Sequence, residues 1–243
     1  MHRKLSHLDC EIEVYAPYGT PKHELTEDYL SSPSQMSLEG KGRRAEKLNP
    51  SWVLLIEVLR GLEEQPYANP VGRVIFQKIC YVLTEMGVQT GFQFKKGSYG
   101  PFADEVKVAL HEFANRNWLQ EERLGKMIAL RISPQYKLDR AKFSDLITQN
   151  EKKIAKTVDL FSRIKNTEQA EEVLTVLFAS RELKKISSQG DLAEQQLYDY
   201  ILGWKKAWKT EEKELALASA IRNLVLLGWM KLQLSDSLLE EAL

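Results

Sequence analysis

The fold is decided by the stretch Asn69-Pro-Val-Gly-Arg-Val-Ile-Phe-Gln-Lys-Ile-Cys-Tyr-Val-Leu-Thr-Glu-Met-Gly87. It opens with a helix start signal, because asparagine favours the N-cap and proline the first helical position. The spacing of its apolar residues predicts a helix with one buried face, and Gly87 predicts the C-cap of that helix. The apolar residues recur at i, i+3 and i+4 spacing as Val71, Val74, Ile75, Ile79, Val82, Leu83 and Met86.

Elements on both sides of this helix complete a recognisable order. Apolar periodicity, alternation and turn residues predict each of them. They are a helix after Asn49-Pro50, a strand over 92–96, a turn over 97–101, a helix from Phe102 to about Asn115 and a hairpin over 118–132. Helix, strand, helix and hairpin follow each other in winged-helix folds. We therefore predict a winged-helix-like α+β subdomain over residues 49–134, with the hairpin as its wing.

Proline and glycine divide the rest of the chain. All eight prolines lie at or before Pro134, and only three of the 13 glycines lie after Gly125. Because proline breaks helices and glycine weakens them, residues 135–243 are predicted to form a helical subdomain. The expected helices cover about 140–165, 168–185, 191–207, 211–227 and 235–242. The predicted fold class is mainly α with short β elements, a winged-helix-like first part followed by a helical bundle.

Two segments precede these subdomains. Within residues 1–17, the alternation of Cys10-Glu-Ile-Glu-Val-Tyr-Ala16 predicts a strand that Pro17 ends. Residues 18–48 carry prolines, glycines, serines and scattered charge with little periodicity. That composition predicts a linker or a partly ordered loop.

The charge balance narrows the function classes. The 243 residues contain 34 basic and 34 acidic side chains, so the formal net charge is zero. A nucleic-acid coat or a polybasic membrane-binding protein needs a strong positive field, which this chain lacks. No apolar run is long enough to span a membrane. The two cysteines, Cys10 and Cys80, predict free thiols in a reducing compartment, so we expect a cytoplasmic protein.

Catalytic patterns are poorly represented. The sequence has neither a G-x-G-x-x-G motif after a strand nor a P-loop. His111-Glu-Phe-Ala-Asn115 lacks the second histidine of a zinc helix, and a zinc site needs three or four ligands. We therefore predict no catalytic residues, no metal and no cofactor, and expect that the protein is not an enzyme.

The segment with the strongest character is Lys95-Lys-Gly-Ser-Tyr-Gly-Pro-Phe-Ala-Asp-Glu105. It is a tight turn followed by a helix start, with an aromatic residue on each side of Gly100-Pro101. Proline fits the first helical turn, and the two acids suit the positive end of a helix. One interpretation is a conformationally demanding turn that serves the fold. The other is an edge that contacts a partner.

This segment and the helix before it resemble the C-terminal region of DarG-type antitoxins. The resemblance rests on Phe76-Gln-Lys-Ile-Cys-Tyr-Val-Leu-Thr-Glu-Met-Gly87 and on Phe94-Lys-Lys-Gly-Ser-Tyr-Gly-Pro-Phe-Ala-Asp-Glu105. It extends to Trp204-Lys-Lys-Ala-Trp208, to Leu227-Gly-Trp229, and to Glu11-Ile-Glu-Val-Tyr-Ala-Pro17, which is similar to the strand and exit after the family's macrodomain. It covers about residues 10–235. A similar helix and Tyr-Gly-Pro arrangement recurs in the wider Panacea or SocA-like antitoxin group.

The resemblance implies a function in a bacterial toxin–antitoxin system. DarG proteins pair a macrodomain, which removes ADP-ribose from DNA, with a C-terminal domain that blocks DarT, a toxin that ADP-ribosylates single-stranded DNA. The present chain has no room for a macrodomain and none of its glycine-rich loops, so we expect either a fragment or a stand-alone antitoxin half without hydrolase activity. The expected partner is a DarT-like toxin that the chain binds directly, and neither nucleic acid nor membrane is expected as a direct partner. The expected state is a monomer or a 1:1 complex with the toxin.

A blocker of a DNA groove needs acidic groups and flat surfaces where phosphates and bases would bind. The candidate partner-binding residues are Lys95, Lys96, Tyr99, Phe102, Asp104, Glu105, Glu121 and Glu122, and Gly97, Gly100 and Pro101 are the candidate structural turn. For Glu121 and Glu122, on the predicted wing, a solvated surface is the competing interpretation. Since the net charge is zero, we expect local acidic contacts as DNA mimicry, with no uniformly acidic decoy.

Two alternatives stay open. The first is a winged-helix DNA-binding regulator that places helix 102–115 in the major groove, with Lys107, His111 and Arg116 as contacts. That helix also carries Asp104, Glu105 and Glu112, which phosphates would repel. The second alternative is an adaptor that delivers a toxin to a protease.

Overall fold

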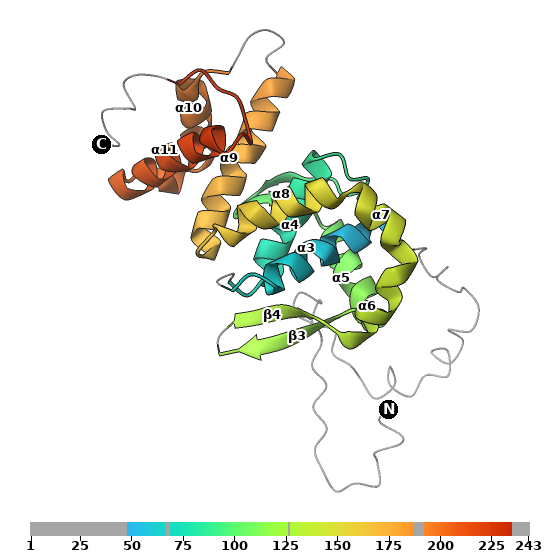
Figure 1. Cartoon of the computed structure of the whole chain (residues 1–243). Coiled ribbons are helices and arrows are strands. Elements are labelled where there is room, and N and C mark those ends of the chain that lie inside the picture. The colour runs from blue at the N-terminus through green and yellow to red at the C-terminus, as the bar shows by residue number, and fades with distance from the viewer. Residues whose placement is uncertain (1–47, 67–68, 126, 187–191, 235–243) are drawn as a thin grey trace, which may run out of the picture. The chain divides into compact units, whose positions relative to one another are not determined.

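The computed structural model describes residues 48–66, 69–125, 127–186 and 192–234, which belong to one compact unit. These residues are mainly helical, with two small antiparallel sheets, and the predicted fold class is confirmed (Figure 1). The predictions for residues 1–17, for nearly all of the linker 18–48 and for the tail helix at 235–242 lie outside the described residues. Within the described part of the chain, no helix combines the length and the apolarity needed to cross a membrane.

The first two helices confirm the apolar stripes, but only one of the two start signals. Asn49 is the N-cap of the 3-10 helix η2 (Pro50–Trp52), and its Oδ1 accepts a hydrogen bond from Ser51 N at 3.0 Å. Helix α3 (Val53–Glu63) follows directly. Helix α4 (Arg73–Glu85) begins three residues later than predicted. Asn69 does not cap it, because its side chain instead donates to two carbonyls at the end of another helix.

The segment after α4 folds into a hairpin where a turn and a helix were predicted. Strands β1 (Lys95–Gly97) and β2 (Gly100–Phe102) pair antiparallel, and α5 (Glu105–Asn115) begins only after them. Pro101 therefore lies in a strand, and Phe102 is not helical. The reason is tertiary, because α4 side chains bind the carbonyls of Pro101 and Ala103 and hold this segment extended.

The predicted hairpin is confirmed as β3 (Leu119–Leu124) and β4 (Met127–Ile132), which lie at the lower left of Figure 1 and are called the wing below. The pairing joins Leu119 to Ile132 and Leu124 to Met127. Contacts from α5 lie on β3, and contacts from α3 and α4 lie on β4.

The prediction of one continuous helix over 140–165 is wrong, because the chain forms several short helices there. The chain forms α6 (Pro134–Asp139), the 3-10 helix η3 (Arg140–Phe143), α7 (Ser144–Gln149) and α8 (Glu151–Ser162). Phe143 and Asn150 leave helical backbone geometry and separate these pieces. At the start of η3, the Arg140 side chain is held by two hydrogen bonds to Glu57 on α3.

The remaining helices agree closely with the predicted ranges. They are α9 (Thr167–Ile186), α10 (Glu194–Trp204), the 3-10 helix η4 (Lys206–Trp208) and α11 (Glu211–Leu226). Thr210 caps α11, and its side chain accepts a hydrogen bond from Lys213 N. Helices α10 and α11 both contact α9 (Figure 1).

Helix α3 lies at the centre of the core. Residues 53–59 are buried around the whole helix, which packs against α4 and α8. Helix α9 in turn contacts α4 and strand β2. Helices from both sides of residue 134 therefore contribute to one core, and β2 lies against α4 and α9.

Candidate functional site

The β1–β2 hairpin contains most of the predicted site residues. Lys95 pairs with Phe102, Lys96 with Pro101 and Gly97 with Gly100, so Ser98 and Tyr99 form the tip. A Cβ added at Gly97 would lie 2.9 Å from the carbonyl oxygen of Gly100. Gly100 has a φ of +84°, a conformation that side chains other than hydrogen rarely allow. Both glycines are thus required by the turn geometry.

Side chains of helix α4 hold the second strand of the hairpin through hydrogen bonds to backbone groups of that strand and of the residue after it. Lys78 Nζ donates to the carbonyl of Pro101 at 2.9 Å. Gln77 donates to the carbonyl of Ala103 at 2.8 Å and accepts from the amide of the same residue at 3.2 Å. These contacts give a physical reason for the joint occurrence of Gln77-Lys78 and the Gly-Pro turn. Sequence reasoning included both side chains in a motif but assigned them no role.

A second lysine holds the tip of the hairpin. Lys205, between α10 and η4, donates through Nζ to the carbonyl of Ser98 and, at 2.7 Å, to the carboxylate of Glu171 on α9. Lys205 is only 8 % exposed, and the rings of Trp204 and Trp208 lie 5.2 Å from its ammonium. The contact spans 107 residues of sequence, so local patterns gave no signal for it.

The side chains that pack against Gly100 are buried and polar. Lys78 lies there with Thr175, and a Cβ at Gly100 would lie 3.4 Å from Lys78 Nζ and 3.0 Å from Thr175 Oγ1. Burial lowers the pKa of Lys78 to about 8; the charge of Lys205 acts in the same direction, and that of Glu171 opposes it. Since a buried lysine is costly, its position under the turn indicates that the hairpin is firmly specified.

Tyr99 has the opposite environment. Its side chain is 67 % exposed at the hairpin tip, and it makes neither a hydrogen bond nor a ring contact with another described residue. A large aromatic residue contributes nothing to the core in this position. Large exposed aromatic side chains on rigid supports are typical anchors of protein interfaces.

The charged residues beside the tip are already engaged. Lys95 Nζ lies 2.8 Å from Asp104 Oδ2, and this hydrogen bond raises the pKa of Lys95 and lowers that of Asp104. Lys96 lies over the rings of Tyr200, at 4.3 Å, and Trp204, at 5.4 Å. The hairpin therefore presents a mixed surface of cations, one carboxylate and aromatic rings.

The other predicted residues are placed differently. Phe102 is half-buried at the end of β2, and Glu105 lies in the first turn of α5. Glu121 and Glu122 lie on β3, in the other sheet. The structure thus gathers the residues from 95 to 105 on one hairpin and its exit, while these two glutamates belong to a different element.

Glu121 and Glu122 are also paired within the protein. The carboxylate of Glu121 lies 2.6 Å from Arg73, and that of Glu122 lies 2.6 Å from Arg131. Such exposed pairs contribute little to stability, but they reduce the negative field that the wing offers to a partner.

Helix α5 offers a weak surface for DNA. Lys107 and His111 are exposed, but Arg116 lies 3.7 Å from Glu112 and 5.6 Å from the ring of Trp118. The helix thus presents two cationic or titratable side chains beside several acids. This balance gives the major-groove alternative no additional support.

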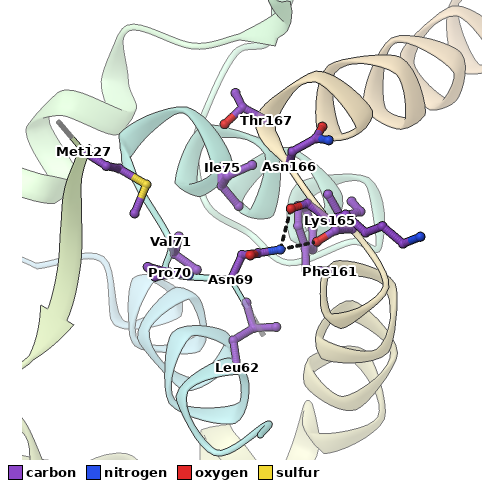
Figure 2. A pocket seen from close by; sticks show the side chains of 11 residues that line it. Leu62, Asn69, Pro70, Val71, Ile75, Met127, Phe161, Lys165, Asn166 and Thr167 are labelled. Atoms are coloured by element: carbon purple, nitrogen blue, oxygen red, sulfur yellow. Dashed lines mark hydrogen bonds between the residues drawn. The ribbon is translucent and has the colours of Figure 1, made fainter. Parts of the chain in front are cut away.

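A separate groove of about 240 Å³ opens between α3, α4, β4 and the α8–α9 junction (Figure 2). Asn69 crosses it, and its amide donates to the carbonyls of Ile164, at 3.1 Å, and Lys165, at 2.6 Å. The walls are largely apolar, with no cluster of acid, base and nucleophile. The lining residues are Leu62, Asn69, Pro70, Val71, Ile75, Met127, Phe161, Ile164, Lys165, Asn166 and Thr167.

The described residues contain neither an exposed free cysteine nor a cluster of side chains that could bind a metal. Cys80 is fully buried, and burial raises the pKa of its thiol well above the ordinary value, so it is a core residue. No group of three or more histidine, cysteine, aspartate or glutamate side chains in residues 48–66, 69–125, 127–186 and 192–234 could hold a metal ion.

Comparison with known proteins finds neither a family model that matches the chain nor a curated relative. The β1–β2 hairpin, with Tyr99 at its tip, is therefore the candidate site on geometry alone.

Proposed function

We propose that this chain is an antitoxin domain that neutralises a DarT-like DNA ADP-ribosyltransferase by binding it directly and blocking its single-stranded DNA site. The resemblance to DarG-type antitoxins supplies the class of partner. The structure supplies a candidate contact, because the residues that carry the resemblance surround one hairpin. Gln77, Lys78, Gly97 and Gly100 serve its backbone, and only Tyr99 extends from its tip without an internal contact among the described residues.

This division of roles is the observation that supports the proposal most. The residues that hold the turn have a structural role within this chain, so they are not evidence for a binding partner. The exposed tyrosine on this turn, which two buried lysines fix, has no such role in the fold, and burial of its ring against a partner would add stabilisation to a complex. In a single-stranded DNA groove, a flat ring occupies the space of a base and competes for the same stacking surfaces.

The ion pairs refine how the domain mimics DNA. Asp104, Glu121 and Glu122 each pair with a cation of this chain, so few carboxylates are free to imitate phosphates. A contact based on a fixed shape and an aromatic anchor agrees with the zero net charge. Charge then sets the orientation of the complex more than its affinity.

The proposal is tested with a purified DarT-like toxin and a single-stranded oligonucleotide. The chain should inhibit ADP-ribosylation of the DNA at a 1:1 ratio, and excess oligonucleotide should displace it. Tyr99→Ala should weaken binding by about 30-fold or more, the effect of losing one interface hot spot. Leu138→Ala, at an exposed apolar position on α6, is the matched control and should bind as the original does.

Charge reversal at Asp104 and Glu105 tests the electrostatic part of the contact. It should weaken toxin binding and lower the melting temperature only slightly, because Asp104 is exposed, Glu105 is half-buried, and water screens their interactions with Lys95 and with the start of α5. Unchanged affinity would remove these acids from the interface. A chain that binds the toxin but leaves DNA modification intact would instead favour the adaptor alternative.

A further inference from the structure

Two short strands alone cannot hold Tyr99 in place. Strands β1 and β2 contain three residues each, and an isolated two-stranded hairpin is at best marginally stable in water. A side chain at its tip therefore has a fixed position only if other elements hold the hairpin. The two sets of contacts described above do this at different points.

The base and the tip of the hairpin have different supports. Lys78 binds the carbonyl of Pro101 in β2, and Gln77 binds the carbonyl of Ala103, the residue directly after β2. Lys205 binds the carbonyl of Ser98, the residue directly before Tyr99. Of the hydrogen bonds from other elements to the hairpin, the one from Lys205 is thus nearest to the tip.

The tip support is itself held in position. The Lys205 ammonium also donates to Glu171 at 2.7 Å, and it lies 5.2 Å from the ring centroids of both Trp204 and Trp208. Glu171 extends from α9, whose backbone lies below Gly100. The lysine therefore has little freedom to turn away from the hairpin.

We propose that Lys205 and Glu171 are positioning residues that preorganise Tyr99 for the partner, which makes the C-terminal helices a functional part of the contact. The inference rests on the proposed function for the identity of the partner, but the preorganisation itself can be measured without it. Without Lys205, the base stays attached through α4 while the tip samples other conformations. The affinity for the partner then decreases in proportion to the fraction of molecules that hold Tyr99 in its binding position.

The first experiment uses the full chain without a partner. Lys205→Met keeps most of the apolar stem and removes the hydrogen-bond donor, and Lys206→Met makes the same change at the next, exposed residue as a control. Amide hydrogen exchange in residues 97–102 should become about tenfold faster in Lys205→Met and stay unchanged in the control. Unchanged exchange in the hairpin of folded Lys205→Met would overturn the proposal.

The second experiment separates positioning from direct contact. With the toxin as the probe, Lys205→Met should weaken binding about tenfold, and Lys205→Arg should restore most of the affinity because it keeps both a charge and donors. In a Tyr99→Ala background, Lys205→Met should have no further effect. An equal loss in both backgrounds would show that Lys205 acts by another route and would contradict the proposal.

The experiments also cover variants that fold poorly and a partner that does not bind. If Lys205→Met melts at a much lower temperature, Glu171→Gln takes its place, since it weakens the support of Lys205 without removing the lysine. If the original chain binds no toxin, the proposed function fails, while the exchange comparison still decides the role of Lys205.

Discussion

Glu57 is a carboxylate inside the core, and we expect Glu57→Ala to lower the unfolding free energy by about 3 kcal/mol. Its Oε1 accepts hydrogen bonds from Tyr136 at 2.7 Å and from Arg140 Nε at 2.9 Å. Its Oε2 accepts from Arg140 at 3.0 Å and from Arg60 at 3.1 Å. The network joins α3 to α6 and to the start of η3.

The magnitude follows from what each partner loses. Tyr136 is fully buried, so its hydroxyl would lose its acceptor away from water, at a cost of about 1–3 kcal/mol. The side chains of Arg60 and Arg140 are 35 % and 40 % exposed and regain water, so they contribute less than the arginines of a fully buried pair. Lost packing adds about 1 kcal/mol. A total of about 3 kcal/mol lowers Tm by roughly 6–12 °C for a domain of this size.

The sign of the pH dependence is also defined. Burial alone would raise the pKa of Glu57, but hydrogen bonds from Arg140 and Tyr136 and the charge of Arg60 outweigh burial and lower it below 4.5. The folded state then binds fewer protons than the unfolded state, so this stabilisation is present above pH 4.5 and is lost as the pH falls through the folded pKa.

The assay is denaturant unfolding of the original chain and of two variants. Glu64→Ala is the matched control, because Glu64 is an exposed partner of the same Arg60, and its loss should cost less than about 0.5 kcal/mol. Combining Glu57→Ala with Tyr136→Phe should cost less than the sum of the single changes. A loss below about 1 kcal/mol for Glu57→Ala, or equal to that of the control, would refute the reasoning.

Three further predictions concern the hairpin and its alternatives. Gly100→Ala should cost about 2 kcal/mol, since it combines a positive φ with a contact of 3.0 Å to Thr175, and Gly91→Ala, at φ +77° in open space, should cost about half as much in the same melts. Lys78→Met removes a group whose folded pKa of about 8 lies below its ordinary value of 10.5. As the pH rises, the unfolded state therefore keeps this proton after the folded state has lost it. The difference in unfolding free energy between the original chain and Lys78→Met should then grow, in favour of the original chain, by about 1 kcal/mol per pH unit from pH 8 to 10. In a gel-shift assay at physiological salt, the chain alone should leave duplex and single-stranded DNA unshifted, and a clear shift would favour the DNA-binding regulator.

Sequence patterns predicted those helices and strands whose structure depends mainly on interactions between residues close together in the sequence. The apolar stripes before Gly87, the hairpin around Gly125 and the cap at Thr210 all depend on neighbours within a few residues. The errors occur where distant side chains act on the backbone. Asn69 donates to residues 95 and 96 positions away instead of capping α4.

The candidate site shows the same distinction. The turn glycines and the exposed Tyr99 could be found in the sequence, because tight turns require particular residue types. The strand at Pro101 could not, since it depends on Lys78 of another element. Lys205 was missed for the same reason, although the motif around it was noticed.

The central claim is that the β1–β2 hairpin contacts the toxin. Hydrogen exchange of the full chain, alone and with a DarT-like toxin at saturating concentration, tests it most directly. We predict strong new protection of residues 95–105, centred on Tyr99, and little change in the wing strand at residues 119–124. A stable complex that leaves residues 95–105 exchanging as in the free chain would contradict this claim.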